Sequence, residues 1–321
     1  MTETTSIAVV CGGVGAARFL RGLIDAVDDP GSITAVVNTG DDCSLHGLWI
    51  SPDLDTITYT LAGAIDPERG WGLVEESWRA MESLERFEAV RPVGSAAAPR
   101  WFNLGDRDLA THFYRTARLG EGATLTEVTD EIRRAWGVPI HMVPMSDHRC
   151  STFVTVADGS EISFQDYFVR LRHGVPVTSV RFDGDAALSE PARRALAGAT
   201  SVVIAPSNPL VSIGPIRALD GVDELLASRR DRVVAISPLV GGAALKGPAD
   251  RMLVELGHEP SVVGVARLYS PIASTLVIDT VDAHHRAAVE ATGMRCIVTD
   301  TVMATPEISR QLALDTIASL A

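Results

Sequence analysis

Short apolar runs rich in β-branched residues alternate along this chain with stretches that have helical spacing. The first run, SIAVVCGG, ends at glycine, and VGAARFLRGLIDAV follows it with apolar residues at helical intervals. A second run, GSITAVVNTGDD, ends in a polar turn. A strand, a helix and a second strand in this order indicate a parallel sheet, because parallel neighbours need a crossover connection between them.

The same pattern returns in the last third of the chain. ATSVVIAPSNP, DRVVAISPLVGG and SVVGVA are interpreted as further buried strands, and TLVIDT and MRCIVTD as the closing strands. Helical stretches such as IRALDGVDELLASRR and GPADRMLVELG separate them. We therefore predict an α/β fold with a doubly wound, Rossmann-like, mostly parallel sheet, built as a nucleotide-binding core from residues 1–65 and 186–321.

The middle of the chain, residues 66–185, is predicted to be an inserted acceptor-side cap that is mainly helical and carries a β-hairpin. GWGLVEESWRAMESLERF, GDRDLATHFYRTARLGEG and TLTEVTDEIRRAWGV have helical signals, and the last of them begins with a Thr–Glu capping pattern. STFVTVADGSEISFQDYFVRLR alternates around Asp158 and Gly159, which is typical of a hairpin. Core and cap are expected to form one structural unit.

The overall charge limits the partners of this chain. Its 41 acidic residues against 28 basic ones give a formal net charge of −13, which disfavours general binding to nucleic acid or to an anionic membrane. No run approaches the roughly 18 apolar residues of a membrane helix, and the start of the chain does not have the pattern of a signal peptide. We expect a cytoplasmic protein. Any anionic substrate would have to be held locally, by backbone N–H groups, a few arginines or a metal ion.

A glycine turn joins the first strand to the first helix, and its glycines are Gly12, Gly13 and Gly15. Such glycines let the backbone approach a phosphate at the start of a helix, although an ordinary tight turn has the same pattern. Arg18 replaces the third glycine of a dinucleotide-binding motif, and the second strand ends in NTG rather than in an acid. Both features count against a nicotinamide-dependent oxidoreductase.

Four aspartates follow the second strand within fifteen residues: Asp41, Asp42, Asp53 and Asp55. Asp41 and Asp42 lie at the strand's end, at the edge of the sheet where ligands bind in doubly wound folds. Asp53 and Asp55 point to the same side if their segment is extended, and cap a helix if they begin one. Carboxylates beside a phosphate site are typical Mg²⁺ ligands, so metal binding by at least one of the four is predicted over capping alone.

Further polar loops are expected at the same edge of the sheet. LGDRDLATH indicates an N-capped helix with a local ion pair, or an arginine-bearing acidic turn that holds a diphosphate and its metal. APSNPLVSIGPI and ISPLVGGAALKGPAD follow two other strands with small polar residues and prolines. Three such loops at one edge predict a nucleotide-sized ligand. GxSxG, HExxH and GxxxxGK[ST] motifs do not occur in the sequence, which counts against a serine hydrolase, a zinc protease and a P-loop protein.

The chain resembles the 2-phospho-L-lactate transferase family of coenzyme F-420 biosynthesis in the order and wording of its motifs, which are GGVGAARFL, VVNTGDD, ISPDLDTITYTLAG, DPERGWG, LGDRDLATH, MSD, FQDYFV, APSNPLVSIGPI and SPLVGGAALKGPAD. The resemblance implies transfer of a phospholactyl or phosphoenolpyruvyl group from a guanosine diphosphate ester to the ribityl hydroxyl of the deazaflavin Fo, with release of guanosine monophosphate. It also implies Mg²⁺ as cofactor and a homodimer.

The resemblance assigns roles to residues of this chain. Asp41 and Asp55 would be catalytic, and Asp41, Asp53 and Asp55 would hold the metal. The substrates would be bound by Gly12, Gly13, Gly15, Asn38, Thr39, Asp106, Arg107, Ser207, Asn208, Ser212, Gly214 and Ser237. The deazaflavin would stack on Trp71, Trp101 or Phe102. Archaeal members have a basic residue where this chain has Asn103, and bacterial-type wording such as DPERGWG favours the enolpyruvyl donor.

A related set of proteins offers an alternative function. These proteins share the glycine turn, the NTGDD-like turn and the SNP loop, and they bind nucleotide sugars as regulators of cell-envelope growth. The PDLDT and LGDRD stretches favour an acceptor pocket and hence the transferase. Binding of a deazaflavin would separate the two functions.

Overall fold

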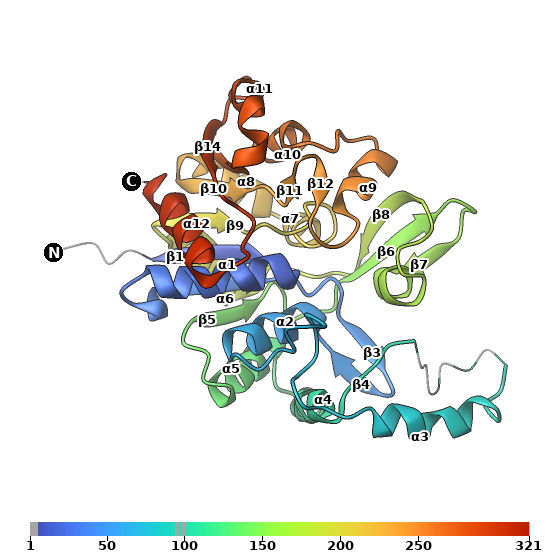
Figure 1. The fold of residues 1–321 in the computed structure, drawn as a ribbon. Helices are drawn as coiled ribbons and strands as arrows, with labels where there is room; N and C mark the ends of the chain where they lie inside the picture. Colours follow the sequence, from blue (N-terminus) through green and yellow to red (C-terminus); the bar gives the residue numbers. More distant parts are fainter. Residues whose placement is uncertain (1–5, 94, 96, 98–100, 321) are drawn as a thin grey trace.

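A parallel sheet forms the centre of the protein in the computed structural model, which describes residues 6–93, 95, 97 and 101–320 (Figure 1). Its strands among these residues are β1 (Ile7–Cys11), β2 (Ile33–Val37), β5 (His141–Pro144), β9 (Ser201–Ile204), β10 (Val233–Ile236), β13 (Thr275–Asp279) and β14 (Arg295–Thr299). They are hydrogen-bonded in the order β14-β13-β10-β9-β1-β2-β5, and all the pairs are parallel. The order reverses between β1 and β9, which confirms the doubly wound, Rossmann-like prediction.

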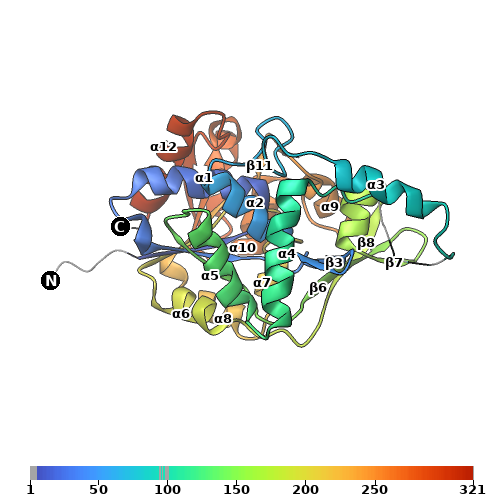
Figure 2. The same ribbon diagram turned by 90° about the horizontal axis from the view of Figure 1, so that it is seen from below.

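Helices cover both faces of this sheet (Figure 2). One face carries α1 (Gly13–Ala26), α2 (Pro52–Leu61), α5 (Leu125–Ala135) and α12 (Pro306–Ala318), and the other carries α6 (Glu190–Gly198), α8 (Val222–Ala227) and α10 (Val262–Tyr269). Alternate strand residues enter two separate cores: Val9 packs on the α1 side and Val10 on the α6 side. Because both faces are buried, the strands are continuously apolar rather than alternating.

The middle of the chain adds α3 (Arg79–Glu88) and α4 (Asp106–Gly120), followed by an antiparallel sheet of β6 (Ser151–Val156), β7 (Glu161–Ser163) and β8 (Val177–Asp183). The pairing of β6 with β7 confirms the hairpin around Asp158. The same segment contributes β5, which pairs with β2 in the main sheet. The parallel sheet is therefore not made from residues 1–65 and 186–321 alone, and the rest of the domain division stays a prediction.

One predicted strand is a helix. SVVGVA forms the beginning of α10, where the side chain of Ser261 accepts hydrogen bonds from the backbone N–H groups of Val263 and Gly264. The prediction of a strand was wrong because α10 is almost wholly buried, so its apolar run lacks the polar positions that distinguish a helix from a buried strand.

One predicted helix begins late. GWGLVEESW forms an irregular segment, and α3 starts only at Arg79. Backbone φ angles of 73° at Gly70, 66° at Gly72 and 58° at Glu75 are left-handed and interrupt a right-handed helix. We call residues 66–78 the strap. Its Arg69 pairs with Asp66 and Glu76, and its guanidinium carbon lies 5.4 Å and 5.0 Å from the ring centroids of Trp71 and Trp78.

The remaining elements are short. They are η1 (Pro30–Ser32), β3 (Cys43–Leu45), β4 (Leu48–Ile50), η2 (Asp166–Arg170), α7 (Gly214–Arg217), η3 (Arg230–Arg232), β11 (Leu239–Val240), β12 (Ala243–Ala244), α9 (Ala249–Glu255), η4 (Thr280–His285) and α11 (Arg286–Glu290). No helix in the described part of the chain combines the length and apolarity that crossing a bilayer requires.

Candidate active site

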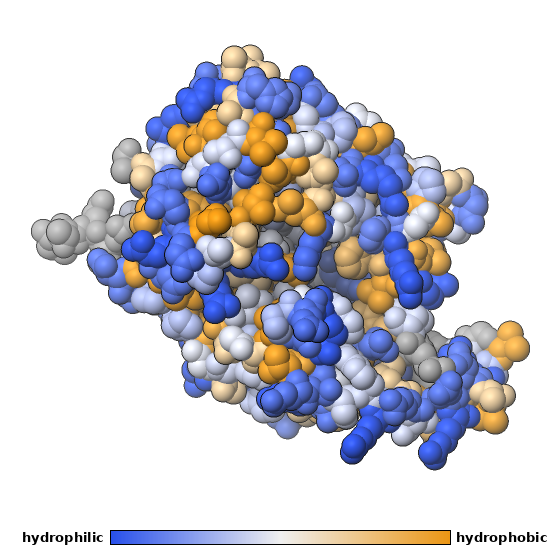
Figure 3. All heavy atoms as spheres, in the orientation of Figure 1, coloured by the Kyte–Doolittle hydropathy of each residue, from blue (hydrophilic) through white to orange (hydrophobic). Residues whose placement is uncertain are grey.

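A cavity of about 890 Å³ lies beyond the carboxyl ends of β1 and β9, where the strand order reverses. Its wall comes from the glycine turn, the start of α2, the strap, the loops after β9 and β10, and residues 301–304 after β14. Figure 3 shows this face of the molecule hollowed between the part that carries α9 and the part that carries α2 and α4. Doubly wound folds bind their ligands at this position.

The cavity collects many of the predicted site residues. Those on its wall are Gly12, Gly13, Gly15, Asp41, Asp53, Trp71, Trp101, Phe102, Asn103, Ser207, Asn208, Ser212 and Ser237. Those not on its described wall are Asn38, Thr39, Asp55, Asp106, Arg107 and Gly214. The sequence therefore placed the glycine turn and the loops after β9 and β10 at the cavity, whereas these polar residues lie behind its wall.

The glycine turn is locked to the loop after β9. The Ser207 hydroxyl donates to the carbonyl of Gly12 at 2.8 Å, and the Gly12 N–H donates back to the hydroxyl at 3.3 Å. A Cβ on Gly15 would lie 2.3 Å from the carbonyl oxygen of Pro206, and one on Gly12 would lie 2.4 Å from Asp53 Oδ2. Only glycine fits these approaches, which leave the N-terminus of α1 facing the cavity.

Asp41 and Asp53 form an acidic pair on the cavity wall. Burial raises the pKa of Asp53 to about 6, against hydrogen bonds from Asn38 and the Gly13 N–H that favour the carboxylate. Burial and then the charge of Asp53 raise the pKa of Asp41 well above its ordinary value. Asp41 Oδ1 is buried and makes no hydrogen bond of ordinary geometry with the described residues, although the neighbouring Thr152 hydroxyl favours the carboxylate and lowers the pKa of Asp41. Two adjacent carboxylates with an unpartnered oxygen fit a divalent cation.

Asp42 faces away from this pair. Its Oδ2 accepts hydrogen bonds from Trp49 Nε1 at 2.9 Å and from the Ser51 hydroxyl at 2.6 Å. Burial raises its pKa to about 7, although both hydrogen bonds oppose the shift. Asp42 therefore fastens the β3–β4 hairpin to the start of α2 and does not reach the described cavity wall.

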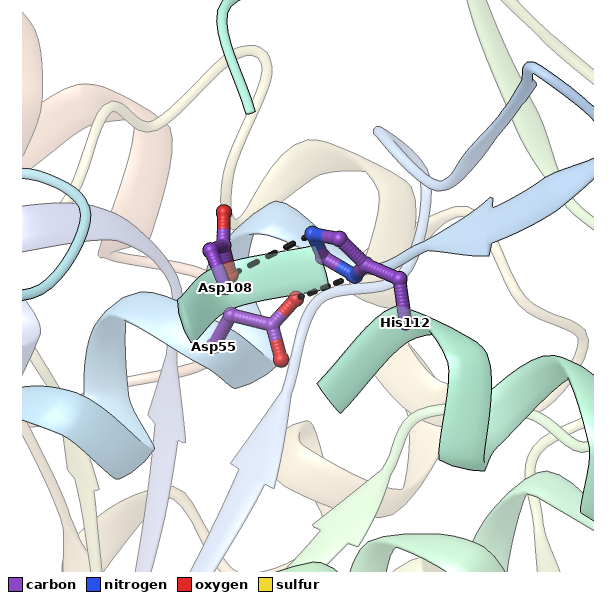
Figure 4. Close-up of side chains that lie close together, drawn as sticks. All are labelled: Asp55, Asp108 and His112. Carbon is purple, nitrogen blue, oxygen red and sulfur yellow. Dashed lines mark ion pairs between the residues drawn. The ribbon is translucent and has the colours of Figure 1, made fainter. Parts of the chain in front are cut away.

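Asp55 lies on the other side of α2, against α4 (Figure 4). Both terminal nitrogens of Arg115 donate to its carboxylate, and His112 Nδ1 lies 3.7 Å from it. His112 Nε2 lies 3.2 Å from Asp108 Oδ1, which also accepts a hydrogen bond from the Tyr59 hydroxyl at 2.7 Å. We call Asp55, Tyr59, Asp108, His112 and Arg115 the α2–α4 cluster.

The α2–α4 cluster contains metal-ligand types but already holds a cation. Ligand atoms of Asp55, Asp108 and His112 all lie within 4.8 Å of one another. Burial opposes the ionisation of Asp108, but its contacts with His112 and Tyr59 and the charge of Arg115 hold its pKa below the ordinary value. The guanidinium supplies the positive charge that these carboxylates need. Of the four aspartates, Asp41 and Asp53 therefore lie together on the cavity wall, while Asp42 and Asp55 each have their own partners elsewhere.

Asp106 and Arg107, predicted to bind substrate, hold the strap against α4. Asp106 accepts hydrogen bonds from the backbone N–H of Ser77 at 2.7 Å and from its hydroxyl at 3.1 Å. Arg107 donates to the carbonyl of Val74 at 2.7 Å. Because the strap forms part of the cavity wall through Arg69, Gly70 and Trp71, these contacts reach the cavity indirectly. Their direct role in binding stays a prediction.

One part of the cavity wall is aromatic. Trp71, Trp101 and Phe102 lie on it, as predicted for a stacking surface, together with Phe164 and Phe168, whose rings stack at 5.5 Å. Trp71 is 44% exposed although Arg69 and Trp78 pack against its ring, so part of its surface stays open to a ligand. The cavity thus combines a glycine turn at a helix N-terminus, an acidic pair and aromatic surface, which suits ligands with both anionic and planar parts.

The wall at residues 301–304 has a buried anchor that the sequence reasoning missed. Asp279, at the end of β13, accepts hydrogen bonds from the Thr301 N–H at 2.8 Å and the Thr301 hydroxyl at 2.9 Å. It also accepts one from the Val281 N–H at 3.0 Å. Burial opposes its ionisation, but these donors outweigh burial and lower its pKa.

Asp279→Asn is expected to lower the free energy of unfolding at pH 7 by about 2 kcal/mol, because one of the two accepting oxygens is lost. The folded pKa of Asp279 lies below the unfolded one, so its stabilisation is present at neutral pH and is lost as the pH falls through the folded value. The difference between parent and variant should therefore shrink toward pH 3. Urea unfolding at several pH values measures it, with the exposed Asp25→Asn as control. A difference that does not change with pH would contradict this role.

The comparison with known families decides the identity. The family model described as 2-phospho-L-lactate transferase CofD matches residues 7–314. The chain belongs to the 2-phospho-L-lactate transferase family. It is a transferase of coenzyme F-420 biosynthesis, in agreement with the resemblance of its motifs.

Relatives and solved structures agree with this membership. Proteins named phosphoenolpyruvate transferase are 42% identical in Streptomyces griseus (95% of this chain and 96% of theirs) and 39% in Kitasatospora aureofaciens (96% and 95%). A third, in Mycobacterium avium, is 38% identical (91% and 92%). A crystal structure of a UPF0052 family member from Bacillus halodurans matches with a TM-score of 0.62 at 15% identity, over 100% of both chains. That likeness shows a shared fold alone.

Proposed function

We propose that this transferase moves a phosphoenolpyruvyl group from a guanosine diphosphate ester to the ribityl hydroxyl of the deazaflavin Fo. The observation that carries the proposal is the Asp41–Asp53 pair beside the glycine turn, in a cavity that also has an aromatic wall. The names of the relatives at 38–42% identity favour the enolpyruvyl over the lactyl donor. A cavity of about 890 Å³ accommodates a nucleotide diphosphate beside a tricyclic ring.

The proposed reaction is a displacement at phosphorus. The ribityl oxygen bonds to the β-phosphorus of the donor, the bond from that phosphorus to the bridging oxygen breaks, and guanosine monophosphate leaves with that oxygen. The hydroxyl proton passes to a base. Such transfers depend on positioning and charge neutralisation more than on covalent catalysis. The Gly12–Gly15 turn would hold the diphosphate, and the Ser207, Asn208 and Ser237 loops would hold the guanosine.

Asp41 and Asp53 are the proposed ligands of Mg²⁺, which supplies positive charge beside the diphosphate when it is bound. Asn38 orients Asp53 by donating to its Oδ2 at 2.9 Å, so that one carboxylate is fixed before any ligand enters. Asp55, predicted as a further ligand and as a catalytic residue that accepts a hydrogen bond or a proton from the ribityl hydroxyl, is held by Arg115. That role stays a prediction, and it would require Asp55 to leave the guanidinium.

Purified protein incubated with Fo, Mg²⁺ and the enolpyruvyl donor should form the phosphodiester, and a divalent-metal chelator should stop product formation. Mass spectrometry detects the product, the lactyl donor run in parallel tests donor choice, and a chelator presaturated with Mg²⁺ is the control. Product with the lactyl donor alone would reverse the donor assignment. Transfer that survives full chelation would contradict the metal site.

The competing function is binding of a nucleotide sugar by a regulator that lacks transferase activity. The same preparation should therefore be titrated with a uridine nucleotide sugar and with Fo. No product from any donor, tight binding of the nucleotide sugar and no binding of Fo would overturn the proposed function. The proposed homodimer is measured in the same samples by sedimentation.

A further inference from the structure

The α2–α4 cluster lies directly behind the acidic pair of the cavity. Asp53 and Asp55 are two residues apart in the first turn of α2, and a separation of two residues turns about 200° around a helix. Asp53 therefore reaches the cavity while Asp55 points to α4, where Arg115 receives it. The first turn of α2 is therefore held by Asn38 through Asp53 on the cavity side and by Arg115 through Asp55 on the α4 side.

Arg115 is the central donor of this cluster. Its side chain is only 2% exposed, and both of its terminal nitrogens donate to the two oxygens of Asp55, in the bidentate geometry that fixes direction as well as distance. The same NH1 lies 3.2 Å from His112 Nδ1, which places Nε2 toward Asp108. A single guanidinium thus links Asp55 on α2 to His112, one turn earlier on α4.

The first turn of α2 lacks a side-chain cap, although Asn38 donates to Asp53 and Leu54 packs in the core on the α1 side. Ser51 precedes it without a capping hydrogen bond from its side chain, because its hydroxyl donates to Asp42 instead. Pro52 contributes no N–H at the first helical position. The rotation of this turn helps to decide where the Asp53 carboxylate points, and on the α4 side it is held by the contact between Asp55 and Arg115.

We propose that Arg115 is a positioning residue for the divalent-cation site: it fixes the rotation of α2 so that Asp53 stays beside Asp41 and the glycine turn. This rests on the proposed function, since Asp41 and Asp53 are the proposed ligands. Arg115 itself does not reach the described cavity wall and acts only through α2. A merely structural ion pair would affect stability but not the metal affinity of the folded protein.

The test measures Mn²⁺ binding by electron paramagnetic resonance in the full chain, together with thermal unfolding and steady-state transfer. Arg115→Met removes the guanidinium that donates twice to Asp55, and Arg115→Lys keeps the charge on a single ammonium group. The control is Arg118→Met, one turn further along α4, whose side chain pairs with Glu121 and Glu131. At a temperature where all variants are folded, Arg115→Met should bind Mn²⁺ at least tenfold more weakly. Arg115→Lys should bind several-fold more weakly, and Arg118→Met should match the parent.

The outcomes separate this inference from the proposed function. A parent that neither binds Mn²⁺ nor transfers overturns the proposed function. A parent that does both, with a folded Arg115→Met of parental Mn²⁺ affinity, overturns the positioning role alone. Tighter Mn²⁺ binding in Arg115→Met would also overturn it, because Asp55, Asp108 and His112 would then hold a metal once the guanidinium is gone. If Arg115→Met does not fold, parental affinity in Arg115→Lys overturns the role.

Discussion

Asp53→Asn is expected to lower kcat/KM for transfer by about 10³-fold, which is about 4 kcal/mol of transition-state stabilisation. Asparagine keeps the size of the side chain and an oxygen that accepts from Asn38, but it removes a charge next to Asp41. The fold should persist, because burial already raises the pKa of Asp53 to about 6 and the neutral side chain relieves repulsion with Asp41.

The measurement for Asp53→Asn is steady-state transfer at saturating Mg²⁺, with thermal unfolding to confirm the fold. Asp42→Asn is the matched comparison, because Asp42 is equally buried and lies next to Asp41 but does not reach the described cavity wall. It should stay within about tenfold of the parent kcat/KM, which is about 1.4 kcal/mol. A folded Asp53→Asn that also stays within tenfold of the parent would remove Asp53 from the proposed machinery.

The four aspartates show where the sequence stops being informative. The pattern of strand and turn predicts Asp41 and Asp42 at the ligand-binding edge of the sheet, and of these two only Asp41 lies on the cavity wall. Asp53, which follows a loop, lies on the wall as well. The direction of each carboxylate depends on the local backbone. An extended PDLDT would have turned Asp53 and Asp55 to the same side, whereas the helix that forms turns them to opposite sides.

The partners of these aspartates lie far away in the sequence. Asp55 meets Arg115 across 60 residues, and the spacing of Asp108, His112 and Arg115 on one helical face was the available signal. Nothing in the sequence says which element that face packs against. The fold was more predictable than the site because buried strands and helices repeat a period, whereas a side-chain contact between two helices depends on their packing.

The strap illustrates the same limit for the backbone. The apolar residues of GWGLVEESW have the spacing of a helix, but Gly70, Gly72 and Glu75 adopt left-handed backbone conformations. The contacts that hold this geometry come from Arg107 and Asp106 on α4, with Arg69 pairing inside the strap. Tertiary contacts therefore override the local preference and place Trp71 on the cavity wall.

Gly15→Ala is expected to lower the free energy of unfolding by about 2–3 kcal/mol, the usual cost of forcing an extra carbon into a packed region. The new Cβ would lie 2.3 Å from the backbone carbonyl oxygen of Pro206, which no side-chain rotation can relieve. The loop after β9 must move, and the hydrogen bonds between Ser207 and Gly12 would weaken. Affinity for guanosine diphosphate, measured by calorimetry, should fall at least tenfold, or about 1.4 kcal/mol.

Gly120→Ala is the matched control for this substitution. Gly120 ends α4, and a Cβ there would meet nothing within 4 Å. Alanine favours a helix over glycine by up to about 1 kcal/mol, so the control should be as stable as the parent or more so, with unchanged nucleotide affinity. If Gly15→Ala retained parental stability and affinity, the loop after β9 would be free to move away. The close approach of the two loops would then not be needed to bind the nucleotide.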